Sequence, residues 1–351
     1  MLRRLGVARV PAIAAVSLVC GLFVTAWGCA STPRPNPDPT ATQTAVPTPD
    51  RTNDPTSART AAPSGATPSG AATATPAFTT RTLIAALKAY EARVGFAPTG
   101  NFATTTNEPF PGRCYYTGKL ELPDSYQGLR VVGAANGRCA IDESQYDVFA
   151  YALETAATGS SAVTPALEGA TLERLLMLVP HEDFHNQPEA QRAPPPLAEA
   201  AATLAGFVAA AGFAREQFGA DTPTYRHLAA EADLFARKAR VVNEHHRQVA
   251  DLYAAHRAGR VPLDQTLEQK GRLFQALAQA CLAVSPAPVS FNRCPPVLNN
   301  AGLAFDRTYT RDYQVLFDRT RQLDVTGTVR ALRETLGRGD AGASPGSGSS
   351  P

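Results

Sequence analysis

The spacing of apolar residues changes along the chain and separates two kinds of structure. Within residues 80–94, Leu83, Leu87 and Tyr90 recur every three or four positions, which predicts a helix with one buried face. Within residues 102–151, apolar and β-branched residues instead form short runs separated by Gly, Asn and Pro. Such runs are typical of strands, so we expect a small sheet of two to four strands, with residues 160–163 as a candidate edge.

From residue 167 onward the apolar spacing is helical again. Thr171 is positioned to cap a helix that carries the segment 181–185 and that Pro188 ends, and Pro180 inside it predicts a kink or a restart of that helix. Further helices are expected from near Leu197, from 221 to 258, from 262 to 283, over 296–322 and over 325–336. The pattern therefore predicts a mostly helical α+β domain with a small N-terminal sheet.

The ends of the chain differ from this domain in composition. Residues 1–29 combine arginines near the start with an apolar run that ends at Cys29, as in a bacterial lipoprotein signal, which predicts lipidation of Cys29. The alternative is an uncleaved signal anchor, because the apolar run is about long enough to span a thin bilayer. Residues 30–77 contain ten of the 29 prolines and are predicted to be a disordered tether, and 337–351 a disordered tail. Residues 78–336 remain as one domain, which we expect on the outer face of the cell membrane.

Charge and cysteine content narrow the class of protein further. The formal net charge is +2, which gives no reason to expect nucleic acid as a partner. Four cysteines lie in the predicted domain, and an even number in an exported domain suggests two disulfides. Proximity in the sequence favours the pairs Cys114–Cys139 and Cys281–Cys294, and none of the four has the spacing of a zinc knuckle.

The strongest chemical signal is His181-Glu182-x-x-His185, which follows an apolar run. On a helix, positions i and i+4 share a face, so the two imidazoles would point at a single site. Two neutral imidazoles at this spacing can hold Zn²⁺, and the neighbouring Glu182 can accept a proton from a water that the metal activates. The alternative is a helix whose histidines merely face the solvent.

Glu199 supplies a candidate third ligand, 14 residues after His185. It shares one face of its predicted helix with Thr203 and Gly206, and this small face can approach another backbone closely. We expect Glu199 in the first turn, where the helix dipole favours an anion. Together with the histidine pair, Glu199 completes a three-ligand zinc site that leaves a fourth position for water. Without that pair, it would be interpreted as a solvated glutamate.

Three segments, in this order, resemble those of a family, the bacterial predicted aminopeptidases of the zincin clan, many of which are lipoproteins. They are His181-Glu182-x-x-His185, then Leu197-Ala-Glu-Ala-Ala-Ala-Thr203, similar to the family's Asn-Glu-Ala-x-Ala-Thr, and Leu298-Asn-Asn-Ala301, followed by Tyr309. The resemblance covers roughly residues 82–335. It implies zinc-dependent hydrolysis of a peptide substrate, with His181, His185 and Glu199 as ligands and Glu182 as the general base.

Two departures from the family pattern bear on metal affinity and rate. Asp183 is charged where zincins usually have an uncharged residue, and Ala198 replaces the family's Asn beside the predicted ligand Glu199. An aminopeptidase also needs an acid to hold the substrate's ammonium group, and Glu154 is a candidate for this role.

Four downstream residues are candidates for stabilising the oxyanion of a reaction intermediate, namely Tyr309, Tyr313, His245 and His246. The plainer interpretation of the tyrosines is a packing or surface role, and that of the histidines is a solvated helix face. A different functional class also remains open. It is a non-catalytic zincin-like envelope lipoprotein that acts as a binding or scaffold protein, which the loss of Glu182 or of a ligand would have favoured.

Overall fold

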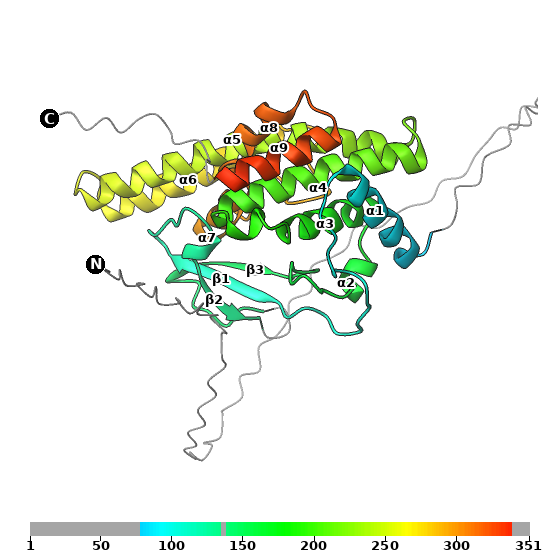
Figure 1. Ribbon diagram of the computed structural model, residues 1–351. Coiled ribbons are helices and arrows are strands. Elements are labelled where there is room, and N and C mark those ends of the chain that lie inside the picture. Colours follow the sequence, from blue (N-terminus) through cyan, green and yellow to red (C-terminus); the bar gives the residue numbers. More distant parts are fainter. Residues whose placement is uncertain (1–77, 135–137, 339–351) are drawn as a thin grey trace, which may run out of the picture. The chain divides into compact units, whose positions relative to one another are not determined.

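The structure is a computed structural model that describes residues 78–134 and 138–338 (Figure 1). The predicted export signal with Cys29, the predicted tether and residues 339–351 of the predicted tail lie outside the described residues. The described part is mostly helical and contains one small antiparallel sheet, which confirms the predicted α+β class. Its helices are α1 (Thr80–Val94), α2 (Pro165–Glu168), α3 (Leu172–His185), α4 (Pro195–Phe218), α5 (Pro223–Arg257), α6 (Leu263–Leu282), α7 (Asn300–Thr310), α8 (Tyr313–Thr320) and α9 (Val325–Arg338).

Most helices begin and end close to their predicted bounds. α1 has the predicted range, and the Thr79 hydroxyl accepts a hydrogen bond from the Thr82 amide at its start. The expected helix over 296–322 is instead divided into α7 and α8, and α2 was not predicted. α9 continues to Arg338, two residues beyond the predicted end of this helix.

Helix α3 carries the His-Glu-x-x-His sequence and begins as predicted, with the Thr171 side chain accepting from the Arg174 amide. It runs unbroken through Pro180, so of the two predicted alternatives the restart is wrong and the kink stays a prediction. An internal proline removes one backbone hydrogen bond and costs about 3 kcal/mol. Met177 and Val179 on this helix have no exposed surface, and burial of side chains of this size contributes about 1.5–3 kcal/mol each. Packing of α3 in the core therefore offsets the cost of the proline.

Helix α4 lies at the centre of the core and contacts α3, α5, α7, α8 and α9. By length and composition it is apolar enough to cross a membrane, but 83% of its most apolar stretch is buried inside this protein, as in the core helix of a folded domain. Because α4 begins at Pro195, Glu199 is its fifth residue and lies beyond the first turn. The predicted dipole contribution to Glu199 is therefore wrong.

The sheet contains β1 (Arg113–Gly118), β2 (Arg130–Gly133) and β3 (Tyr146–Tyr151), in the order β2-β1-β3 with both pairs antiparallel. It lies on one side of the helices, below α3 and α4 in the view of Figure 1. Phe305 of α7 packs against the aromatic rings of β1 and β3, with the Tyr115 ring centroid at 5.1 Å and that of Phe149 at 4.7 Å. The candidate edge at 160–163 forms only an isolated bridge between Val163 and Thr105.

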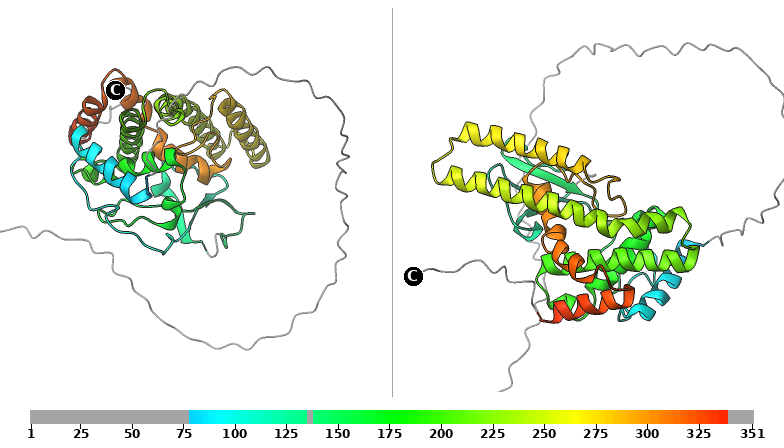
Figure 2. Two further views of the ribbon diagram at one scale, coloured as in Figure 1. Left: turned by 90° about the vertical axis from the view of Figure 1, so that its right-hand side faces the viewer. Right: turned by 90° about the horizontal axis from the view of Figure 1, so that it is seen from above.

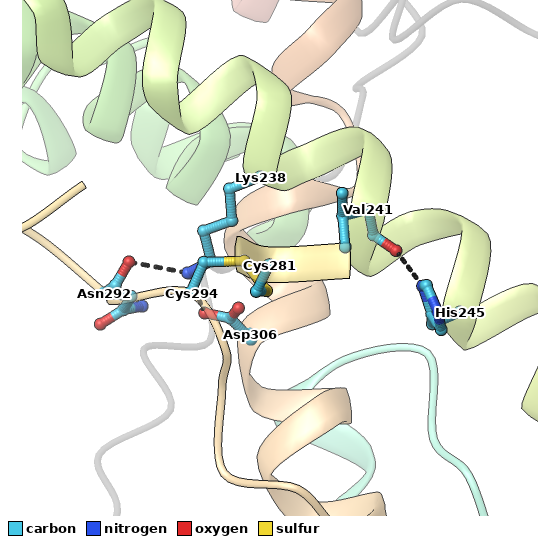
Figure 3. The surroundings of a disulfide bond; sticks show 7 residues. All are labelled: Lys238, Val241, His245, Cys281, Asn292, Cys294 and Asp306. Atoms are coloured by element: carbon cyan, nitrogen blue, oxygen red, sulfur yellow. Dashed lines mark hydrogen bonds and ion pairs between the residues drawn. A yellow bond between two sulfur atoms is a disulfide. The ribbon is translucent and has the colours of Figure 1, made fainter. Parts of the chain in front are cut away.

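Helices α5 and α6 lie side by side as an antiparallel pair (Figure 2). A second, smaller core cluster fills the space between them and includes Val242, Leu277 and Cys281. The Cys281–Cys294 disulfide joins the end of α6 to the loop that follows it (Figure 3). The buried Lys238 ammonium of α5 donates to the Asn292 carbonyl oxygen of the same loop at 2.8 Å. The other disulfide joins Cys114 of β1 to Cys139. Both pairs are those predicted from sequence proximity.

Candidate metal centre

Three side chains from two neighbouring helices converge at the contact between α3 and α4. His181 Nε2 lies 3.2 Å from His185 Nε2, and the Glu199 Oε2 atom lies 3.0 Å from His185 Nε2 and 3.6 Å from His181 Nε2. These three side chains lie close enough together to hold one metal ion. Among the described residues, no other group of three histidine, cysteine or acidic side chains does so. The structure thus brings together the ligand set that the sequence predicted.

The distances fit a tetrahedral ion. Metal–ligand bonds of about 2.0–2.1 Å place the donor atoms of a tetrahedral site about 3.3–3.4 Å apart. The three observed separations, 3.2, 3.0 and 3.6 Å, lie on either side of this value. Two imidazole nitrogens and one carboxylate oxygen are also donors that suit a divalent ion such as zinc. The residues present therefore fit a metal ion bound at this point.

Gly206 lets the two helices approach closely enough for this geometry. A Cβ atom at position 206 would lie 2.9 Å from the Met177 carbonyl oxygen and 3.3 Å from the His181 Cβ atom. Glu199 lies seven residues earlier, two turns away on the same face of α4, and therefore also faces α3. The small face predicted from the sequence is the face that contacts the histidine helix.

Burial and mutual charge set the protonation of the three side chains in the metal-free protein. Burial lowers the pKa of His181, so its imidazole is neutral. Burial also opposes protonation of His185, but the Glu199 carboxylate overrides it and raises the pKa of His185 to about 9. Although burial alone would raise the pKa of Glu199, the two imidazoles hold it far below its ordinary value. The metal-free site is therefore a protonated His185 paired with an ionised Glu199.

Glu182 lies in the wall of the same cavity but is not part of the ligand group. Burial raises its pKa to about 7, with the negative charges of Glu199 and Asp183 adding to this effect and His185 opposing it. A carboxyl group with a pKa near neutrality can both accept and release a proton, which is the property that a general base requires.

The cavity that contains these residues has a volume of about 420 Å³. Aromatic rings form much of its wall and come from the sheet, from the loops and from α7, namely Tyr115, Tyr126, Tyr151, Phe291, Phe305 and Tyr309. The Phe291 ring centroid lies 5.0 Å from that of His181. Phe291 belongs to the loop that the Cys281–Cys294 disulfide closes, so this disulfide limits the freedom of one wall of the cavity.

Asp183, the charged departure from the family pattern, faces away from the three ligands. Its carboxylate forms an ion pair with Lys88 of α1 at 2.5 Å, and it accepts hydrogen bonds from the Thr99 hydroxyl and, at 2.9 Å, from the Asn101 side-chain amide. Its charge is thus balanced on the rear side of α3. Ala198, the second departure, lines the cavity beside Glu199.

The four oxyanion candidates have different positions. Tyr309 lines the cavity, and burial together with the charge of Glu199 raises its pKa well above the ordinary value, so its phenol is a neutral donor. Tyr313 donates to the Ala232 carbonyl oxygen at 3.1 Å, away from the cavity. His245 Nδ1 lies 2.8 Å from the Val241 carbonyl oxygen of its own helix (Figure 3), and His246 Nε2 lies 3.1 Å from that of Pro123. Both histidines are buried, so the predicted solvated face is wrong.

Glu154 lines the cavity but is already paired. Both of its carboxylate oxygens accept from Arg174 Nε, at 2.7 and 2.8 Å, and Arg174 Nη2 donates to the same carboxylate. This bidentate pair balances the charge of Glu154 within the protein. Arg113 of β1 also lines the cavity, on the side of the sheet.

Sequence reasoning missed Tyr126, which lies in the short 3₁₀ helix η1 (Tyr126–Gly128). Its phenol donates to the Glu199 Oε1 atom at 3.0 Å, and its ring lines the cavity. Tyr126 lies 55 residues before His181, at no spacing that a known motif defines. The sequence therefore contained no signal for this contact.

Comparison with protein-family models, with curated proteins and with solved structures finds no match to this chain. The resemblance to zincin-clan aminopeptidases therefore rests on the three short segments, and function has to be argued from the site itself.

Proposed function

We propose that this protein is a zinc-dependent metallopeptidase with a zincin-like fold. The observation that carries the proposal is the presence of Glu182 in the wall of the cavity onto which His181, His185 and Glu199 converge. A site built only to hold a metal has no need of a second carboxyl group, with a pKa near 7, beside the three ligands. A hydrolase needs this acid as a base.

The residues of the chain divide the chemistry among them. His181, His185 and Glu199 would hold the ion, which when bound supplies Lewis acidity that polarises a peptide carbonyl and acidifies water. Glu182 takes the proton of the attacking water and then delivers it to the leaving amine. The neutral phenol of Tyr309, one of the tyrosines that line the cavity, can donate to the carbonyl oxygen as it gains negative charge.

The resemblance extends the proposal to aminopeptidase activity, which requires that the substrate's ammonium group be held. Glu154 in the cavity wall is the acid that would bind this ammonium group. The ammonium group would have to compete with the Arg174 guanidinium for the Glu154 carboxylate. Peptides with free and with acetylated N-termini separate the two kinds of peptidase. An aminopeptidase cleaves only the free peptide, whereas an endopeptidase cleaves both.

The alternative proposal is a non-catalytic envelope protein that keeps the metal site for binding or scaffolding. The aromatic cavity wall supports it, since such a wall can bind a ligand without chemistry. In both proposals the protein is displayed outside the cell membrane through a lipid on Cys29 or through an uncleaved signal anchor.

Metal content and hydrolysis of a mixed peptide library, measured on the same purified protein, test the main proposal. We expect about one zinc ion per chain and cleavage that a chelator abolishes and added zinc restores. Zinc binding without any cleavage would favour the scaffold alternative, and absence of zinc binding would contradict the metallopeptidase proposal itself.

A further inference from the structure

We propose that Tyr126 is a positioning residue, which orients the Glu199 carboxylate for the metal and thereby sets the metal affinity of the site. The inference deepens the proposed function and rests on its metal site, although not on peptide hydrolysis. The inference starts from the observation that the two carboxylate oxygens of Glu199 have different partners. Oε2 is the atom that lies 3.0 Å from His185 Nε2, whereas Oε1 accepts the Tyr126 phenol at 3.0 Å.

The direction of this hydrogen bond is fixed. A tyrosine phenol has an ordinary pKa of about 10 and therefore keeps its proton at neutral pH. A carboxylate that serves as a metal ligand is ionised, so Glu199 can only accept. A neutral donor on Oε1 prevents the carboxylate from rotating about its χ3 axis, and thus keeps Oε2 directed at the imidazoles. Partners of this kind orient metal ligands and usually change metal affinity by about 10–100-fold.

The backbone around Tyr126 is anchored on the helices that carry the rest of the cavity. The Tyr126 amide donates to the Thr308 hydroxyl of α7 at 2.8 Å. Three residues earlier, the Pro123 carbonyl oxygen lies 3.1 Å from His246 Nε2 of α5. Asp124 pairs with Arg307 at 3.3 Å and with Arg311 at 3.2 Å. The segment that carries the phenol is therefore held in place by contacts with both α5 and α7.

The ring of Tyr126 is fixed as well. Its centroid lies 5.8 Å from that of Phe305 and 6.5 Å from that of Tyr309, both of which line the cavity. With the ring packed and the backbone anchored, little conformational entropy remains to be lost when the phenol binds Glu199. Through this hydrogen bond, the position of the 120–129 segment determines the orientation of Glu199. His246 contacts the same segment, so we assign it a structural role in place of the oxyanion role.

The variant Tyr126→Phe tests the inference because it removes the phenol oxygen and keeps the ring. We expect the dissociation constant for zinc, measured on the full chain by competition with a chromogenic chelator, to rise about 10–100-fold. Excess zinc should restore the occupancy of the variant and any hydrolysis that the wild type shows, since mass action compensates for a weaker site.

Tyr253→Phe is the matched control. The Tyr253 phenol donates to the Asn300 side-chain oxygen at 2.8 Å, outside the cavity, so its loss should change the melting temperature without changing zinc affinity. An unchanged zinc affinity in Tyr126→Phe, or an equal loss in both variants, would overturn the inference while leaving the proposed function intact. If the wild type binds no zinc, both fail together.

Discussion

Gly206 on α4 lies so close to Met177 on α3 that a Cβ atom at position 206 would stand 2.9 Å from the Met177 carbonyl oxygen. This contact sets the distance between the helix that carries the two histidines and the helix that carries Glu199. Because the ligand atoms are already within 3.0–3.6 Å of one another, a small separation of the helices would pull the site apart.

Gly206→Ala should therefore weaken metal binding and destabilise the fold. Alanine is the better helix former by about 1 kcal/mol, but the overlap with backbone should exceed this gain and leave a net loss of about 1–3 kcal/mol. Chemical denaturation and zinc titration measure the two effects. Gly271→Ala on α6 is the control, because nothing lies within 4 Å of a Cβ atom there, and it should stabilise the protein. A Gly206→Ala variant that binds zinc as the wild type does would contradict this account of the helix contact.

Glu182→Gln should retain zinc and lose most of the peptide hydrolysis. The amide keeps the shape of the side chain and can still hydrogen-bond a water, but it cannot take a proton, and general base catalysis contributes about 10²–10⁴-fold. Metal analysis and initial rates on the same preparation check both parts. If the variant cleaves peptides as well as the wild type does, Glu182 is not the base and the hydrolase proposal loses its main support.

His185→Ala should lose the metal itself. His181 and Glu199 would remain as two ligands, which hold zinc weakly, and the fold would lose the stabilisation that metal binding provides. Zinc content and the melting temperature with and without added zinc are the measurements. His256→Ala serves as the control, because His256 Nδ1 bonds to the Val261 carbonyl oxygen outside the cavity, and this variant should keep its zinc. Full zinc occupancy in His185→Ala would remove this histidine from the ligand set.

Zinc affinity should increase with pH. The Glu199 carboxylate, acting against burial, raises the pKa of His185 to about 9 in the metal-free protein, so at pH 7 a metal ion has to displace a proton. Apparent affinity should rise by up to about tenfold per pH unit below that pKa. Calorimetric titrations at pH 7 in buffers of different ionisation enthalpy should show release of about one proton. An affinity that does not vary between pH 7 and 9 would contradict the pairing of His185 with Glu199.

The same shift makes the metal-free fold sensitive to alkali. The folded pKa of His185, about 9, lies above the ordinary value of 6.5, so the protonated imidazole stabilises the fold fully below pH 6.5. This contribution is lost as the pH rises through about 9. Denaturation of the metal-free protein at pH 7 and pH 10 measures the loss, and zinc-saturated protein is the control because the metal replaces the proton.

The disulfides should be found as Cys114–Cys139 and Cys281–Cys294 by mass spectrometry of non-reduced peptides. Their Cα atoms are 5.6 and 5.3 Å apart, within the range that a disulfide spans. Replacing both cysteines of one pair by alanine should cost about 3 kcal/mol of stability through the greater entropy of the unfolded chain. Crossed pairs or free thiols in the native protein would show that the pairing is different.

The sequence by itself determined what depends on residues that are near each other along the chain. The periodic apolar residues of 80–94 predicted α1 to its bounds, and Thr171 predicted where α3 begins. The four-residue spacing of His181 and His185 guaranteed that a helix would direct both imidazoles to one side. The disulfide pairs followed for the same reason, since each joins cysteines that are close in sequence.

The tertiary structure decided what depends on how helices pack. Helix α3 continues through Pro180 because its buried neighbours compensate for the lost hydrogen bond, and His245 and His246 are buried because α5 is covered where its polar sequence suggested solvent. The small face of α4 that carries Glu199 and Gly206 could be predicted from the sequence, but its close approach to Met177 and the Tyr126 contact with Glu199 depended on packing between elements far apart in sequence. Periodicity reports only which face of a helix is apolar. Which loop residue contacts that face, as Tyr126 does, is settled by side-chain packing across elements, and no local pattern contains this information.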